Sequence, residues 1–328
     1  MEITSQKLRA ASEASRTALK MHDLVSSPSL RKKLNKLIRP FGVFSLFNLE
    51  RNSKRNSKLN GVAIAVIVKN EAPYIKEWVE YYKIIGITKI YLYDNDSQDD
   101  LKDRIKTDVE SGYIDYHPIH GKVRQSDAYN KALWQARKDR LYLLVIDADE
   151  FLFMKNYTDR LFEIVKGKLN VNDGVGGLAI NWLIFGSSHY ESKQPGLVTQ
   201  TFVKRSPFGF KFNKHVKTLV NPDVAAGFLN PHFPVYIAGY HSVNLNGQTV
   251  EGPFNKPSAD PEIRLNHYFT KSKEEFIKKR SRGMADNLNI RDMGKFEEHD
   301  QNDVFDDSMK RYQAELEKAV QNDGREDA

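Results

Sequence analysis

The sequence predicts an α/β protein with a mostly parallel, doubly wound β-sheet flanked by helices. Three observations carry this prediction: a β-branched apolar run at residues 62–68, an alternation of such strands with amphipathic helices up to residue 146, and polar clusters directly after several strands. Continuous apolar runs are typical of strands buried on both faces, and strands that alternate with helices favour parallel pairing. The 328 residues suffice for one large α/β domain or two small ones.

The first part of the pattern is regular. We expect strands at residues 62–68, 89–93, 113–118 and 141–146, and helices over residues 73–85 and 127–137. Pro73 suits the first turn of a helix, and Gly86 ends the same helix. The alternation therefore predicts parallel neighbours in one sheet.

The second part is less regular and predicts a smaller antiparallel element. Strands are expected at residues 177–185, 199–203, 210–220 and 235–243, helices over residues 273–289 and 303–320, and a mobile loop at residues 247–261. We divide the chain into a basic N-terminal segment, a main α/β domain and a helical extension, at residues 1–60, 61–290 and 291–328.

Acidic side chains follow two of the predicted strands. Asp147 and Asp149 come directly after the strand at 141–146, and Asp94 and Asn95 follow the strand at 89–93. Ligands of doubly wound sheets bind beyond the carboxyl ends of the strands, so these groups should meet in one crevice. The Asp-x-Asp pair suits a divalent cation that bridges to a diphosphate, although a solvated strand end is the simpler alternative. Asp94 and Asn95 fit either a nucleoside or an Asx-type turn.

The charge is unevenly distributed. Residues 1–60 carry 13 Lys and Arg against 4 Asp and Glu, while the rest of the chain carries 37 against 39. A neutral body argues against nucleic acid as a partner. Within the basic segment, residues 31–58 surround several phenylalanines with cations, which suits either a solvated linker or peripheral contact with an anionic membrane. No run approaches the ~18 apolar residues of a membrane span, and no export signal is apparent. We expect a cytoplasmic protein, peripheral on the inner membrane face if the segment binds lipid.

Four segments resemble the glycosyltransferases related to families 2 and 92, which have the GT-A fold. The segments are AVIVKNEAPYIKEWVEYYKIIGITKIYLYDNDSQD, the Gln125–Asn130 stretch, VIDADEFLF and NHYFTKSKEEFIKKRSRG, in matching order and spacing. The resemblance implies a metal-dependent transferase with Mn²⁺ or Mg²⁺ as cofactor. It implies a nucleotide-sugar donor, expected to be a UDP-sugar, and a glycan or lipid-linked acceptor. Bacterial surface polysaccharide synthesis is the expected setting.

The resemblance also implies roles for individual residues. The implied donor contacts are Asn70, Glu71, Asp94, Asn95, Asp147, Lys214 and Lys217, and the implied metal ligands are Asp147, Asp149 and His267. For the two lysines a solvated basic strand is an equal alternative. Trp182 and Phe185 are candidates to stack on an acceptor sugar, with core packing as the alternative.

The catalytic base is not apparent from the sequence. The stretch NWLIFGSSHYES lacks the Glu-Asp pair of inverting relatives, and the nearest candidates are Glu191, His189 and Glu150. The stereochemical course therefore stays open. Two other functions remain: an aspartyl phosphatase of the haloacid dehalogenase type, with Asp147 as nucleophile, and a non-catalytic scaffold at a membrane surface. Phe151, at a position where such phosphatases prefer Thr or Val, counts against the first of these.

Overall fold

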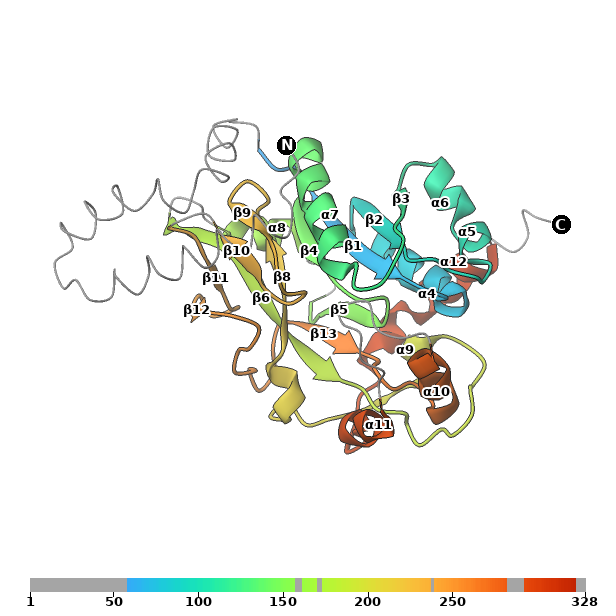
Figure 1. The fold of residues 1–328 in the computed structure, drawn as a ribbon. Helices are drawn as coiled ribbons and strands as arrows, with labels where there is room; N and C mark the ends of the chain where they lie inside the picture. The colour runs from blue at the N-terminus through green and yellow to red at the C-terminus, as the bar shows by residue number, and fades with distance from the viewer. Residues whose placement is uncertain (1–57, 157–160, 170–172, 237–238, 282–291, 323–328) are drawn as a thin grey trace.

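A computed structural model describes residues 58–156, 161–169, 173–236, 239–281 and 292–322 (Figure 1). The basic segment and its proposed membrane patch at 31–58 therefore lie almost entirely outside the described residues. The first elements in chain order are β1 (Val62–Val68), α4 (Ala72–Ile84), β2 (Lys89–Asp94), α5 (Leu101–Arg104), α6 (Lys106–Glu110), β3 (Ile114–Pro118), α7 (Gln125–Asp139), β4 (Tyr142–Val145) and β5 (Glu150–Met154).

The remaining elements complete the described chain. They are α8 (Leu161–Lys168), β6 (Val175–Ile184), α9 (Val198–Thr201), β7 (Lys204–Arg205), η2 (Lys211–Lys214), β8 (Val216–Val220), β9 (Ala225–Phe228), β10 (Pro234–Tyr236), β11 (His241–Val243), β12 (Thr249–Val250), β13 (Ile263–His267), α10 (Lys273–Ser281), α11 (Met293–His299), β14 (Val304–Phe305), η3 (Ser308–Tyr312) and α12 (Gln313–Asn322).

Most strands belong to one mixed sheet. Its order is β12-β11-β6-β8-β4-β1-β2-β3, and β13 pairs with both β5 and β6. The neighbours β4, β1, β2 and β3 are all parallel, whereas β8 runs antiparallel to β4 and β6. Two further sheets, β10-β9 and β14-β7, are short antiparallel pairs. The predicted α/β class, with a parallel sheet and a smaller antiparallel part, is confirmed.

Two apolar cores enclose the parallel strands. Every residue of β1 is buried, and its side chains alternate between the two faces. Val62, Ile64 and Val66 join a core with α4 and α12, while Ala63 and Ala65 join a core with α7. Figure 1 shows α7 on one face of the sheet and α4 with α12 on the other. Burial on both faces explains why β1 has no polar residue before its end.

The pairing of β13 determines where the site forms. β13 runs antiparallel to β5, with His267 opposite Glu150, and parallel to β6, with His267 opposite Ile184. Helix α4 holds β5 in place, because Trp78 Nε1 and Tyr82 Oη both donate to the Glu150 carbonyl. A residue far along the chain is thus brought beside the end of β4.

The C-terminal elements contact the main sheet. β14 pairs with β7, and Asp306 accepts hydrogen bonds from Arg205 and Arg264 at 2.6 and 2.9 Å. Leu316 of α12 is completely buried in the core that α4 shares with β1. These contacts place residues 293–322 against the domain formed by the preceding elements.

Several expected elements differ from the structure. Residues 199–203, expected as a strand, contain α9, because Glu77 of α4 accepts hydrogen bonds from the first backbone amides of that helix. Residues 210–220 divide into η2 and β8, and residues 303–320 contain β14 and η3 before α12. α10 ends at Ser281, and the rest of its expected range is outside the described residues. Elements α5, α6, β5, α8, β9, β13 and α11 were not expected. None of the described helices is both long and apolar enough to cross a bilayer.

Candidate donor and metal site

The ends of β1 and β2 lie side by side. Val68 is the register partner of Asp94, and the Asn95 amide donates to the Val68 carbonyl at 2.8 Å. Asn70 lies in the left-handed region with φ of 53°, and its side-chain oxygen accepts from the Gln98 amide at 2.7 Å. The strained turn after β1 is therefore tied to the loop after β2.

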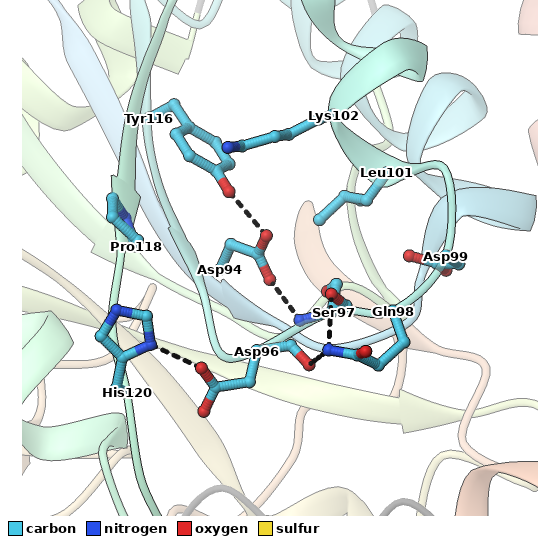
Figure 2. Close-up of a pocket in the computed structure, with 10 residues that line it drawn as sticks. All are labelled: Asp94, Asp96, Ser97, Gln98, Asp99, Leu101, Lys102, Tyr116, Pro118 and His120. Atoms are coloured by element: carbon cyan, nitrogen blue, oxygen red, sulfur yellow. Dashed lines mark hydrogen bonds and ion pairs between the residues drawn. The ribbon is translucent and has the colours of Figure 1, made fainter.

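Beside these ends is a pocket of 270 Å³ with an acidic floor (Figure 2). Its lining residues are Asp94, Asp96, Ser97, Gln98, Asp99, Leu101, Lys102, Tyr116, Pro118 and His120. Tyr116 Oη donates to Asp94 Oδ2 at 2.6 Å, and the Ser97 amide donates to Asp94 Oδ1 at 2.9 Å, so the carboxylate is held in one orientation. Lys102 Nζ lies over the Tyr116 ring, 5.1 Å from its centroid, so the oriented Asp94 carboxylate is the feature of this pocket that suits a nucleobase.

Asn95 and Glu71, two other expected nucleotide contacts, lie outside the lining of this pocket. Asn95 donates its side-chain amide to the carbonyls of Ile119 and Gly121, both at 2.9 Å, and so holds the loop behind the pocket. The backbone of Glu71 begins α4 by accepting from Ile75. Both residues therefore lie next to the pocket without lining it.

Asp147 is enclosed by hydrogen-bond donors. One carboxylate oxygen accepts from Gln125 and Tyr129 of α7, and the other accepts from Lys217 Nζ at 2.9 Å. Burial and the charge of Asp149 raise the pKa of Asp147, but the charge and hydrogen bond of Lys217 together with the charge of His267 lower it, and the net pKa is below the ordinary value. Lys217 is completely buried, so the solvated-strand alternative is wrong for it, whereas Lys214 is exposed.

Asp149 lies between a histidine and a second lysine. His267 Nε2 is 3.5 Å from Asp149 Oδ1, and Lys279 Nζ of α10 forms a short ion pair with Asp149 Oδ2. Burial opposes ionisation of Asp149, but Lys279 and then His267 hold its pKa well below the ordinary value. The main chain reinforces the arrangement, because the Tyr268 amide donates to the Asp149 carbonyl.

These residues only partly fit a divalent cation. The Asp149 carboxylate and the His267 imidazole are donors of types that suit Mn²⁺, and His267 Nδ1 is buried with no hydrogen-bond partner among the described residues. Across the described ranges, however, no three His, Asp or Glu side chains form a group that could hold a metal by themselves. The expected three-ligand set is therefore not assembled: Asp149 and His267 meet, and Asp147 turns to Lys217 instead.

Two of the three base candidates lie on a surface loop, whereas Glu150 adjoins Asp147, whose backbone amide donates to Glu150 Oε2 at 2.9 Å. Glu191 pairs with Lys273 on the surface, with 75% of its side chain exposed, and His189 is exposed on the same loop after β6. Glu150 is completely buried, and burial raises its pKa well above the ordinary value even though Lys217 lies 3.7 Å away. No contact within the described residues joins Glu191 or His189 to the Asp147–Asp149 turn.

An aromatic cluster adjoins His267. Trp182 is half-buried, with its ring centroid 4.3 Å from that of His267 and 4.7 Å from that of His215. Phe254 contacts His215 at 4.8 Å and is 56% exposed. Phe185, by contrast, is 1% exposed and packs on Tyr268, so its expected acceptor role is wrong and it belongs to the core.

Some site residues carried no assigned role in the sequence. Gln125, Tyr129 and Lys279 lie inside the segments that carry the family resemblance, which was the available signal. Tyr116 and His215 had no such signal, because their importance comes from pairing across strands and loops.

The comparison with protein families decides the identity. The model of glycosyltransferase family 92 matches residues 61–243, which include β1, the Asp94 pocket, the Asp147–Asp149 turn and β8. This chain belongs to glycosyltransferase family 92. The observed sheet and the family agree with the GT-A fold expected from the sequence.

Curated relatives of the family 92 chain come from plants. A family 92 protein of Ricinus communis, RCOM_0530710, is 27% identical over 135 residues, which are 41% of this chain and 24% of the relative. The Oryza sativa subsp. japonica protein Os08g0121900 is 24% identical over 192 residues, 58% of this chain and 31% of the relative. This chain thus spans about a quarter to a third of these relatives' length.

Solved structures show a weaker similarity to the family 92 chain. The crystal structure of S. aureus TarS 1-349 in complex with UDP has a TM-score of 0.31 and 14% identity, covering 41% of this chain and 38% of that one.

Proposed function

We propose that this family 92 chain is a metal-dependent glycosyltransferase that moves a sugar from a nucleotide-sugar donor, expected to be a UDP-sugar, to a glycan or lipid-linked acceptor. The observation that carries the proposal is the gathering of acidic groups beyond neighbouring strands. Asp94 ends β2, Asp147 and Asp149 follow β4, and His267 ends β13. β4 and β2 both pair with β1, and adjacent strands are about 4.8 Å apart, so a nucleoside at Asp94 and a diphosphate at Asp149 are within reach of one ligand.

Each group has a task in this proposal. The oriented Asp94 carboxylate holds the base, and Asp149 with His267 holds the cation. A bound divalent cation would offset the charge that develops on the leaving diphosphate. Lys217 keeps Asp147 ionised and fixed, and the half-buried Trp182 offers an apolar face to the acceptor sugar.

The phosphatase alternative is disfavoured. As a nucleophile, Asp147 would need a free carboxylate oxygen facing substrate, yet one oxygen accepts from Gln125 and Tyr129 and the other from Lys217. We therefore favour the transferase over the phosphatase.

The biological setting follows from the resemblance and is part of the proposal. We place the enzyme in bacterial surface polysaccharide synthesis, in the cytoplasm at the inner membrane face. The basic segment 31–58 would make peripheral contact there, because cationic residues near an anionic surface contribute about 1 kcal/mol each.

Nucleotide-dependent thermal stabilisation tests the function. UDP-sugars should raise the melting temperature with Mn²⁺ present, because a ligand that binds only the folded state stabilises it in proportion to its occupancy. EDTA and Asp149→Asn should each abolish the rise, measured against each variant's own ligand-free value. Asp260→Asn, at an exposed ion pair with Lys155, is the matched control.

Two results would contradict the proposal. A rise that persists with EDTA and in Asp149→Asn would refute the metal role, and no rise with any nucleotide sugar would refute the donor. Mn²⁺-dependent hydrolysis of the donor separates an enzyme from a scaffold, since a scaffold has no turnover.

A further inference from the structure

Lys271 lies in the turn that connects β13 to α10, and it is buried. Only 3% of the residue is exposed, although lysine is among the residue types that are least often buried. Its backbone has a φ of 50°, in the left-handed region that non-glycine residues rarely adopt. Backbone strain of this kind persists where the surrounding structure holds it, and it is frequent at binding sites.

The ammonium group of Lys271 lies over an aromatic ring. Its Nζ is 3.9 Å from the centroid of the Tyr74 ring. Over the described stretches of the chain it makes no hydrogen bond or ion pair, whereas the ammonium groups of Lys217 and Lys279 each pair with an aspartate. The face of a ring attracts a cation but does not neutralise it. A mostly buried charge in this position therefore gains from an anionic partner.

The contacts of Tyr74 connect Lys271 to the pocket beside β2. Tyr74 belongs to the first turn of α4, and its hydroxyl donates to Glu275 of α10 at 2.6 Å. In the same turn the Ala72 amide donates to Asp99 Oδ2 at 2.9 Å, and Asp99 lines the pocket. The start of α4 is thus bound both to the pocket loop and to the helix that follows Lys271.

The charge of Lys271 also acts on Asp149. Burial raises the pKa of Asp149, but the charges of Lys279, His267 and Lys271 together hold that pKa well below the ordinary value. Lys271 comes four residues after His267, in the segment that leaves β13. Its ammonium group is therefore near both parts of the proposed donor site, the pocket and the Asp147–Asp149 turn.

We propose that Lys271 binds the diphosphate of the nucleotide-sugar donor, with its ammonium group paired to phosphate oxygens. This inference rests on the proposed function and adds the residue of this chain that neutralises the diphosphate. Hydrogen bonds between an ammonium group and a phosphate are charge-assisted and stronger than neutral ones. The two lysines that the resemblance implies for this role are placed differently, because Lys217 is held by Asp147 and Lys214 is exposed.

A structural role for Lys271 is the alternative, and it makes a different prediction. Burial raises the pKa of Glu77, whereas hydrogen bonds from Thr199 and Val198 and the charge of Lys271 oppose that rise. On this alternative Lys271 only offsets the charge of Glu77, which holds the start of α9. Its removal would then lower stability and weaken ligands with and without phosphate alike.

Isothermal titration of the full chain with Mn²⁺ present tests the inference without measuring turnover. Lys271→Met keeps an unbranched side chain on the Tyr74 ring and removes the charge. We expect this variant to bind UDP about tenfold more weakly than wild type, as for the loss of one hydrogen bond to a charged group. Its affinity for uridine, measured by displacement of UDP, should stay unchanged, because uridine has no phosphate.

Two further variants serve as controls. Lys271→Arg keeps the charge and should retain most of the UDP affinity. Lys193→Met is the matched control, because Lys193 also lies over the Tyr74 ring, with Nζ 5.3 Å from the centroid, but is exposed. It should bind UDP as wild type does. Circular dichroism establishes that each variant is folded, and Lys271→Gln, which is also neutral, takes the place of Lys271→Met if that variant is not.

The outcomes separate this inference from the proposed function. If wild type binds UDP and the neutral variant binds it equally well, the role of Lys271 is refuted and the donor site stands. Equal losses of UDP and uridine affinity would indicate the structural role and refute the inference too. If wild type binds no UDP with Mn²⁺ present, the proposed function fails and this inference fails with it.

Discussion

Lys217 Nζ lies 2.9 Å from Asp147 Oδ2, and no part of the Lys217 side chain reaches solvent. The pair links β8 to the end of β4, and Glu150 is the other acid near the ammonium, at 3.7 Å. Such a pair stabilises the fold mainly by the penalty of breaking it, because the remaining charge is left buried without a partner. The structure therefore ties the integrity of the fold to the chemistry of the site.

Removing Lys217 should destabilise the protein strongly. We expect Lys217→Met to lower the free energy of unfolding by about 3–5 kcal/mol, as is typical when one partner of a buried pair is lost. Urea denaturation measures the loss. Lys214→Met, at an exposed position three residues earlier, should stay within about 0.5 kcal/mol of wild type. The double variant Lys217→Met with Asp147→Asn should recover part of the loss, and failure to recover any would contradict the buried-charge explanation.

Acid should destabilise the fold through buried histidines. Burial lowers the pKa of His232 to about 3 and that of His299 to about 4, against an ordinary value of 6.5. Between pH 6.5 and 4 the unfolded chain binds protons that the folded chain does not, so stability falls as the pH falls. Each histidine contributes a slope of at most about 1.4 kcal/mol per pH unit.

Urea denaturation from pH 7 to pH 4.5 measures this slope. His299→Gln should reduce the acid-induced loss of stability, because the substituted side chain does not titrate. His120→Gln, at a side chain that is 79% exposed, serves as the control. Equal slopes for wild type and His299→Gln would show that the acid sensitivity has another origin.

Tyr116 should contribute to nucleotide affinity through Asp94. Tyr116→Phe removes the donor that orients the Asp94 carboxylate, and the loss of one such hydrogen bond is worth about 1 kcal/mol, or about fivefold in affinity. Isothermal titration with UDP and Mn²⁺ measures the change. Tyr113→Phe is the control, because the buried Tyr113 hydroxyl has no hydrogen-bond partner within the part of the chain that the structure describes, and Tyr113 does not line the pocket. Unchanged affinity in Tyr116→Phe would place the base elsewhere.

Substitution of Trp182 should affect sugar transfer, whereas substitution of Phe185 should affect thermal stability. Trp182→Leu removes a half-buried ring beside His267, and we expect transfer to the acceptor to fall about tenfold while UDP affinity changes little, since stacking is worth about 1 kcal/mol or more. Phe185→Leu should lower thermal stability and leave transfer nearly intact. The reverse pattern, with transfer lost only in Phe185→Leu, would contradict the assignment of these two aromatics.

The early strands and helices were predictable because the residues of each element show by themselves how it is buried and where it ends. β1 is buried on both faces and is apolar throughout, and α4 begins beside Pro73 and ends before Gly86. The residues around α9 show no local pattern that predicts a helix. Residues 199–203 have the composition of a strand, yet Glu77, 121 residues from Val198, accepts its amide and stabilises a helical turn instead. A contact this distant leaves no local pattern in the chain.

The same distinction holds for the site. The amino-acid sequence by itself determined the parallel sheet and the acidic groups at the ends of β2 and β4, because strand ends and their order follow from local patterns and from parallel topology. The candidacy of His267 came from the family resemblance. Only the tertiary structure decided that Lys217 is buried against Asp147, that Lys279 occupies Asp149 and that Phe185 is core. The physical reason is that the partner of a charge, and the burial of a ring, depend on which distant segments pack against it.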